Sequence, residues 1–131
     1  MTRAAALSTG WLAHRSRGCP LDFPVPVTYR LSGAKAPPGV RGTAEFRRGR
    51  LRTLSLTRGV RTATGVTVGR TAAARMVARY HRAGFGASAR FLPTFGGTFV
   101  TVRRHGRQVL GGFAKHRTLT ILAVPAVPVC E

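Results

Sequence analysis

Apolar residues follow a helical period in one part of the chain, between residues 72 and 83. They recur there at i, i+4 and i+7 or i+8, which is typical of the buried stripe of an amphipathic helix. The hydroxyl of Thr71 is expected to cap the start of this helix, and Gly84 is expected to end it. The apolar stripe consists of Ala72, Ala73, Met76, Val77, Tyr80 and Ala83. Another face, which we expect to be solvated, carries Arg75, Arg79 and Arg82.

Outside this segment, short apolar stretches alternate with turns rich in Gly, Pro and Arg, a pattern that predicts β-strands. The basic turns at residues 47–50 and 104–107 predict two hairpins. Within 51–57, Leu54 and Leu56 are expected to point to the core, with Ser55 and Thr57 outward. The predicted strands are residues 27–31, 40–46, 51–57, 85–91, 98–103, 108–113 and 119–124.

These elements predict an α+β fold with one main helix packed on an antiparallel sheet of about five to seven strands. Residues 19–131 are expected to form a single domain. Residues 1–18 contain an interrupted apolar stretch that is interpreted as the remnant of an export signal, a start site placed too late, or a disordered arm. Pro125 and Pro128 suggest that the chain after the last strand follows a sheet edge.

The charge of the chain narrows its possible partners. The 131 residues carry 22 Lys or Arg against 3 Asp or Glu, a net charge of +19. Because 44% of the residues are hydrophobic, the chain is not a disordered polybasic tail. Codons rich in G and C explain Arg in place of Lys, but they do not explain so few acids. Such a field attracts phosphates, anionic lipids or acidic polymers.

Two cysteines, Cys19 and Cys130, lie near the two ends of the chain without a CxxC motif. Their placement suggests one disulfide that joins the ends, which would close a loop of roughly 100 residues and stabilise the fold by about 4–5 kcal/mol. Such a bond would place the protein in an oxidising compartment. The alternative is a pair of buried free thiols.

Catalytic chemistry finds little support in this sequence. Three acidic residues do not readily supply paired carboxylates. The segment 65–71 resembles a phosphate-binding loop, but Arg70 stands where Lys belongs, and we interpret it as a turn that buries Val66 and Val68. The four histidines, which show no metal-ligand spacing, are His14, His81, His105 and His116. No cofactor or metal is therefore expected.

The arginines gather at the two predicted hairpins. If both hairpin tips lie on the same side, these side chains form a surface that binds phosphate or carboxylate. The alternative is a set of solvated turns that reflects codon usage. The candidate anion-binding residues are Arg47, Arg48, Arg50 and Arg52 at the first hairpin and Arg103, Arg104 and Arg107 at the second.

The segment GVRTATGVTVGRTAAARMVARY and the ending ILAVPAVPVCE resemble small exported proteins of high-GC Gram-positive bacteria. More distantly, G-V-x-V-G-x-T ahead of a helix is similar to the module of BamE-type outer-membrane assembly proteins and beta-lactamase inhibitor proteins. This resemblance implies an α+β module used for protein contacts, without catalytic residues. The chain departs from these relatives at Val68, where they favour an aromatic residue, and at Arg70, where Met is common.

These observations favour a non-enzymatic, exported binding module of the cell envelope or the extracellular space. Its partner would be an anionic polymer, a lipid headgroup or an acidic protein. The alternative is a cytoplasmic protein that binds nucleic acid without sequence preference, with an affinity that falls steeply as salt is added. No stretch reaches the ~18 apolar residues that a membrane-spanning helix needs.

Overall fold

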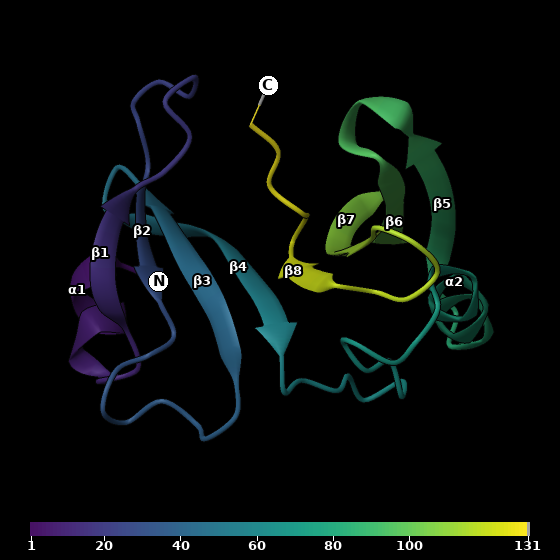
Figure 1. Cartoon of the computed structure of the whole chain (residues 1–131), viewed down its shortest axis with the longest axis horizontal. Coiled ribbons are helices and arrows are strands. Elements are labelled where there is room, and N and C mark those ends of the chain that lie inside the picture. Colours follow the sequence, from purple (N-terminus) through teal and green to yellow (C-terminus); the bar gives the residue numbers. More distant parts are fainter. Residues whose placement is uncertain (131) are drawn as a thin grey trace.

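The computed structural model describes residues 1–130 as an α+β fold with one antiparallel sheet (Figure 1). In this described part the sheet has eight strands in the order β1-β2-β3-β4-β8-β7-β6-β5. The strands are β1 (Ala13–Arg17), β2 (Val27–Arg30), β3 (Arg41–Arg47), β4 (Arg50–Arg58), β5 (Gly86–Leu92), β6 (Gly97–Arg104), β7 (Arg107–Ala114) and β8 (Ile121–Val124). The helices are α1 (Arg3–Ser8), α2 (Ala73–Arg82) and the 3-10 turn η1 (Pro93–Phe95).

The predicted fold class and the antiparallel sheet are confirmed, whereas one main helix on five to seven strands is wrong. The additional strand, β1, has the sequence AHRSR and only its first residue is partly buried, so it has no alternating pattern. It forms because β2 supplies a pairing partner, and Ser16 and Thr28 share a hydrogen bond of 2.6 Å across the pair. The additional helix, α1, is capped by Thr2, whose side chain accepts a hydrogen bond from the amide of Ala5.

Residues 1–18 contain one helix and one strand of the structure. Ala6 of α1 is buried against Tyr29, Ala44 and Phe46, and β1 is an edge strand of the sheet. The sheet thus extends across the expected boundary at residue 19. The export-signal interpretation stays a prediction.

The last strand, β8, lies in the middle of the sheet and joins two halves that are each built from neighbouring strands (Figure 1). It pairs with β4 on one side and with β7 on the other, so that Ser55, Ala123 and Gly111 lie in one row. Leu56, Leu122 and Gly112 form the next row. The two hairpin halves are therefore held together by four residues near the end of the chain.

Both helices lie on the same face of the sheet. Leu56 lines a cavity together with Ala6 of α1, and its direct partner Leu122 packs in the core beneath α2 with Met76. The core under α2 is the larger one and contains Val66, Val68, Ala73, Met76, Tyr80, Val100, Val102, Ala114, Leu119 and Leu122. Among the described residues, neither helix has the length and apolar character needed to cross a bilayer.

The predicted end of the main helix is confirmed and its predicted start is wrong. Gly84 adopts a positive φ of 91°, and the amides of Gly84 and Phe85 donate to the carbonyl oxygens of His81 and Tyr80. This is a Schellman motif, completed by the Tyr80–Phe85 ring contact at 5.4 Å. Thr71 does not cap α2, because its hydroxyl instead accepts from the amide of Thr67 in the preceding turn.

The opposite face of the sheet is covered by the end of the chain. The predicted disulfide between Cys19 and Cys130 is confirmed, with the two Cα atoms 5.5 Å apart, and the segment before Cys130 runs between the two halves (Figure 1). It passes so close to β7 that a Cβ added at Gly111 would lie 2.8 Å from the amide nitrogen of Val127.

Two expectations about this region are therefore wrong. The chain after Val124 crosses the sheet face rather than following an edge. Because it covers that face, Ser55 is buried rather than solvated, while Leu54 and Leu56 are only half-buried on the helix face. The middle of strand β8 is thus enclosed from both sides, at Leu122 and Ala123.

Candidate functional site

The four arginines of the β3–β4 hairpin gather at one hollow. Arg47 and Arg50 are paired across a two-residue turn, in which Arg48 and Gly49 both have positive φ, as in a type I′ turn. The hollow has a volume of about 500 Å³ and is lined by Arg47, Arg48, Arg50, Leu51 and Arg52. The predicted hairpin and the local grouping of these arginines are therefore present.

Two of these four arginines already have partners within the protein. A guanidinium nitrogen of Arg47 donates to the backbone oxygen of Phe23. Arg52 lies 3.4 Å from a carboxylate oxygen of Asp22 and 3.7 Å from one of Glu45. Burial, opposed by the nearby Arg52, raises the pKa of Glu45 above its ordinary value of 4.5. This cluster is therefore partly neutralised.

The arginines of the β6–β7 hairpin are exposed and form a second, separate group. His105 and Gly106 have positive φ, so this turn has the same geometry as the first. The guanidinium carbon of Arg104 lies 5.5 Å from the centre of the Phe85 ring, within the range of a cation–π contact. Arg103 and Arg107 complete the group.

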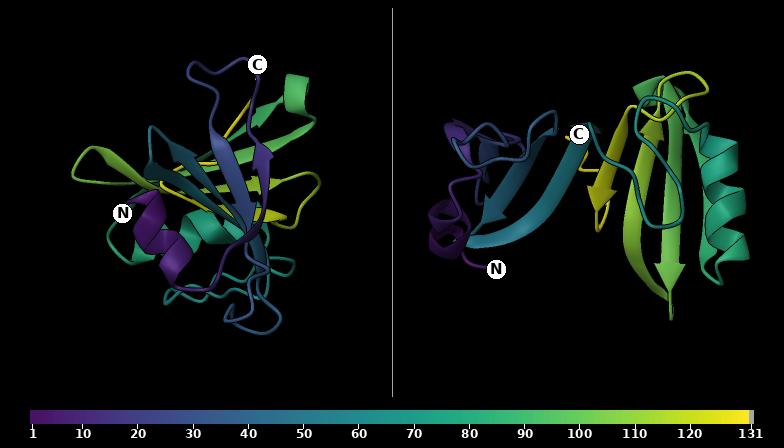
Figure 2. Two further views of the ribbon diagram at one scale, coloured as in Figure 1. Left: turned by 90° about the vertical axis from the view of Figure 1, so that its left-hand side faces the viewer. Right: turned by 90° about the horizontal axis from the view of Figure 1, so that it is seen from below.

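The two hairpins do not form one surface. β4 and β7 run in the same direction on either side of β8, so both hairpins begin at the same end of the sheet. The twist of the sheet separates them, however, and Figure 2 shows the tips in different halves of the molecule. A combined anion-binding surface from both hairpins therefore has no support in this geometry.

A third arginine cluster, which the sequence analysis did not identify, surrounds the start of α2. Its hollow has a volume of about 510 Å³. Three parts of the chain contribute to it: the loop before α2, the face of α2 that carries Arg75 and Arg79, and the segment before β8. We call this the five-arginine hollow, and its cations are Arg61, Arg70, Arg75, Arg79 and Arg117.

The loop before α2 is held in place by its own turns and by the core. Gly65 and Gly69 have positive φ, and the fully buried Val66 and nearly buried Val68 fix the loop to the sheet. The interpretation of this loop as a turn that buries the two valines is thus confirmed. Because these valines point inward, the basic residues of the loop remain at the surface.

Arg117 is distant in sequence from the other residues of the hollow, and backbone pairing places it beside them. Ala72 and Thr118 form an isolated bridge, in which the amide of Ala73 donates to the oxygen of Arg117 at 2.9 Å. This contact places residue 117 beside the first turn of α2. The spacing of Arg75 and Arg79 on one helix face could have indicated part of the cluster, but nothing local predicts that Arg117 joins it.

Two guanidinium groups of the hollow approach the same glycine. Arg79 donates a hydrogen bond to the backbone oxygen of Gly65 and is half-buried, so the expectation that it is solvated is wrong. A Cβ added at Gly65 would lie 3.0 Å from a nitrogen of Arg79 and 3.5 Å from a nitrogen of Arg61. Like charges are therefore concentrated in a small space.

No acidic side chain neutralises this hollow within the described residues 1–130. The two salt bridges among these residues both involve Arg52, which pairs with Asp22 and Glu45 in the other half of the sheet. The first turn of α2 has no acidic residue and no capping side chain, and the positive end of the helix dipole adds to the field. The arrangement can bind phosphate or carboxylate groups through several charge-assisted hydrogen bonds.

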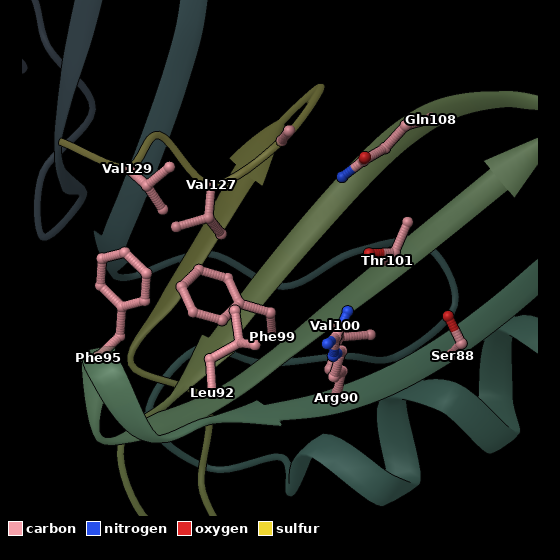
Figure 3. A pocket seen from close by; sticks show the side chains of 11 residues that line it. Ser88, Arg90, Leu92, Phe95, Phe99, Val100, Thr101, Gln108, Val127 and Val129 are labelled. Carbon is pink, nitrogen blue, oxygen red and sulfur yellow. The ribbon is translucent and has the colours of Figure 1, made fainter. Parts of the chain in front are cut away.

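A smaller hollow of about 290 Å³ lies on the other face, between β5, β6 and the end of the chain (Figure 3). Phe95 and Phe99 lie near Val127 and Val129 at its apolar end, and Arg90 is the cation at its polar end. Its walls include the segment that the disulfide holds in place. The hollow is therefore best explained as the place where that segment packs against the sheet.

Comparison of the chain with models of protein families, with curated proteins and with solved structures gives no match. The resemblance to exported proteins and to BamE-type modules stays a prediction. Within residues 1–130, no three His, Cys, Asp or Glu side chains are grouped as a metal site would require. The fold and the hollow thus define an α+β domain with a concentrated, unneutralised basic site.

Proposed function

We propose that this chain is a non-enzymatic, exported binding module that holds a polyanionic partner in the five-arginine hollow. The observation that supports this proposal is that five arginines converge without an acidic counter-charge from the described residues 1–130: Arg61, Arg70, Arg75, Arg79 and Arg117. Bringing five cations together costs free energy through their mutual repulsion. A bound anion offsets that cost, so the hollow gains most from a ligand with several negative charges.

The geometry of arginine indicates the chemistry of the partner. A guanidinium group presents a planar fork of donors that matches two oxygens of a phosphate or carboxylate. Several forks around one hollow suit a polymer with repeated anionic groups, such as an acidic component of the cell envelope. An acidic protein surface presents the same chemistry, and the use in protein contacts that the BamE-type resemblance implies is compatible with it.

The disulfide between Cys19 and Cys130 supports export. Disulfides persist in oxidising compartments and are rare in the cytosol. Fractionation of cells that express the tagged chain tests this part of the proposal, with thiol labelling of each fraction. We expect the oxidised protein outside the cytoplasm, and recovery of a reduced protein in the cytosol contradicts export.

Binding of inorganic polyphosphate, measured by calorimetry at several salt concentrations, tests the site. We expect Arg75→Gln/Arg117→Gln to lose about tenfold or more in affinity and to lower the salt slope by roughly 2, since two phosphate contacts are removed. The matched control is Arg15→Gln/Arg30→Gln, which removes the same charge from exposed positions of β1 and β2.

The outcomes separate the proposal from general charge attraction. A loss confined to the first pair of substitutions supports a site in the hollow. An equal loss in both pairs shows that only the net charge attracts the polymer, which contradicts the proposal. Tighter binding of duplex DNA than of polyphosphate at the same salt concentration would favour the nucleic-acid alternative.

A further inference from the structure

A nearly all-apolar cavity of about 490 Å³ lies on the helix face of the first half of the sheet. Its lining residues come from α1, from β3 and β4, and from the loops beside them, including the one that contains Pro37. Of its fourteen lining residues, only Thr9 is polar. The hydroxyl of Thr9 donates to the oxygen of Ala6 at 2.7 Å, so even this group has its partner within the protein.

This cavity exists because α1 is too short to cover its half of the sheet. The core under α2 has ten buried apolar residues, whereas the core under the six-residue α1 has four. Leu51, Leu54 and Leu56 are only half-buried, and Trp11 is 45% exposed at the cavity. The apolar surface is thus larger than the protein itself covers.

A lysine supplies positive charge beside the cavity. The side chain of Lys35 packs beside Gly10, next to the lining residues Thr9 and Trp11. Arg41 and Arg50 are each next to a lining residue in β3 and β4, so their side chains point to the opposite face. Glu45 does not contribute to this wall, because it lies between two lining residues of β3 and therefore points to the opposite face.

We propose that this cavity binds the hydrocarbon chain of a single-chain anionic amphiphile, a long-chain carboxylate being the simplest case. A cavity of this volume is within the usual range for small-molecule sites. Its lining is almost entirely apolar, which excludes an extended peptide segment, because the peptide's own N–H and C=O groups would be left unpaired. The ammonium group of the neighbouring Lys35 suits a carboxylate or phosphate head group.

This proposal does not depend on the proposed function. The five-arginine hollow is built from the loop before α2, α2 and residue 117, and it shares no lining residue with the cavity. Substitutions in one site are therefore expected to leave the other unchanged. Loss of polyphosphate binding and loss of chain binding can be distinguished in the same protein.

The single tryptophan of the chain, Trp11, lines the cavity and serves as the reporter. The full chain with its disulfide intact is titrated with decanoate, dodecanoate and tetradecanoate, each below its micelle concentration. We expect a saturable blue shift of the emission, with affinity rising about fourfold per added methylene group until the cavity is full. A dodecyl chain with a trimethylammonium head is expected to bind more weakly than dodecanoate, because Lys35 repels it.

Two sets of variants locate the binding. Val40→Phe/Leu54→Phe fills the cavity without adding a tryptophan and is expected to abolish the shift, whereas Leu92→Phe, in the hollow on the opposite face, is not. Lys35→Gln is expected to weaken binding of the carboxylates while preserving the dependence on chain length. Because Lys35 is exposed, this variant retains the test if the filled variant fails to fold.

Several results would overturn the proposal. One is the absence of a saturable shift with tetradecanoate below its micelle concentration. Another is equal binding of the cationic and anionic chains. A third is a response only to vesicles of phosphatidylglycerol, which would indicate attraction of the basic surface to a membrane rather than a chain-binding cavity.

Discussion

Arg79 of α2 donates a hydrogen bond to the backbone oxygen of Gly65, which ties the helix to the loop that precedes it. The bond also fixes the position of one cation in the five-arginine hollow and brings it close to Arg61. An arginine on the outer side of a helix is usually solvated and contributes little to stability. Here the same side chain joins two structural elements and forms part of the candidate site.

Replacement of Arg79 by methionine is expected to lower the free energy of unfolding by about 1.5–3 kcal/mol, the usual range for a hydrogen bond to a charged group. Urea denaturation with the disulfide intact measures this change. Arg82→Met is the matched control on the same helix, since Arg82 is exposed, and we expect it to stay within about 0.5 kcal/mol of the wild type. Equal effects of the two substitutions would show that the contact with Gly65 contributes nothing.

The disulfide is expected to contribute about 4–5 kcal/mol to the free energy of unfolding, because it closes a long loop in the unfolded chain. Its cysteines are separated by 111 positions. Cys19→Ser/Cys130→Ser should lower the midpoint of urea denaturation accordingly, and reduction of the wild-type protein should reproduce the loss. A change below about 1 kcal/mol would mean that the segment on the sheet face stays in place without its covalent bond.

Glu45 is expected to make stability depend on pH. Burial raises its pKa above 4.5, so the folded state holds the proton more tightly than the unfolded state does. The stabilisation is fully present below the unfolded pKa and is lost as the pH rises through the higher folded pKa.

Glu45→Gln cannot ionise at this position. It is therefore expected to be more stable than the wild type at pH 7, and its stability should not fall as the pH rises through the pKa of Glu45. Thermal unfolding of both proteins between pH 3 and pH 8 measures the difference, and their stabilities should converge below pH 4. A variant that is less stable than the wild type at pH 7 would show that the ion pair with Arg52 outweighs the cost of burial.

Local patterns in the sequence predicted the local parts of this fold. The stripe from Ala73 to Tyr80 predicted α2, and the turns at Arg48-Gly49 and His105-Gly106 predicted the two hairpins, because a turn and the strands beside it are specified by neighbouring residues. The Schellman ending at Gly84 is likewise set by the residues around it.

Contacts between distant segments could not be predicted in the same way. Strand β1 has no apolar alternation and depends on β2 for its pairing. Ser55 is buried because the end of the chain covers it, which no pattern within β4 indicates. The candidate site shows the same limit, since each hairpin carries a local arginine cluster but Arg117 reaches the hollow only through the bridge between Ala72 and Thr118.

The repulsion within the five-arginine hollow leads to a prediction about the folded state itself. A ligand that binds only the folded protein raises the free energy of unfolding, by about 2.7 kcal/mol when its concentration is 100 times Kd. Polyphosphate should therefore raise the Tm of the wild type more than sodium chloride of equal ionic strength, which only screens the charges. Arg75→Gln/Arg117→Gln should show a higher Tm than the wild type without ligand, since fewer cations repel one another, and a smaller rise with polyphosphate. If sodium chloride and polyphosphate raise the Tm of both proteins equally, the hollow is a solvated surface and not a binding site.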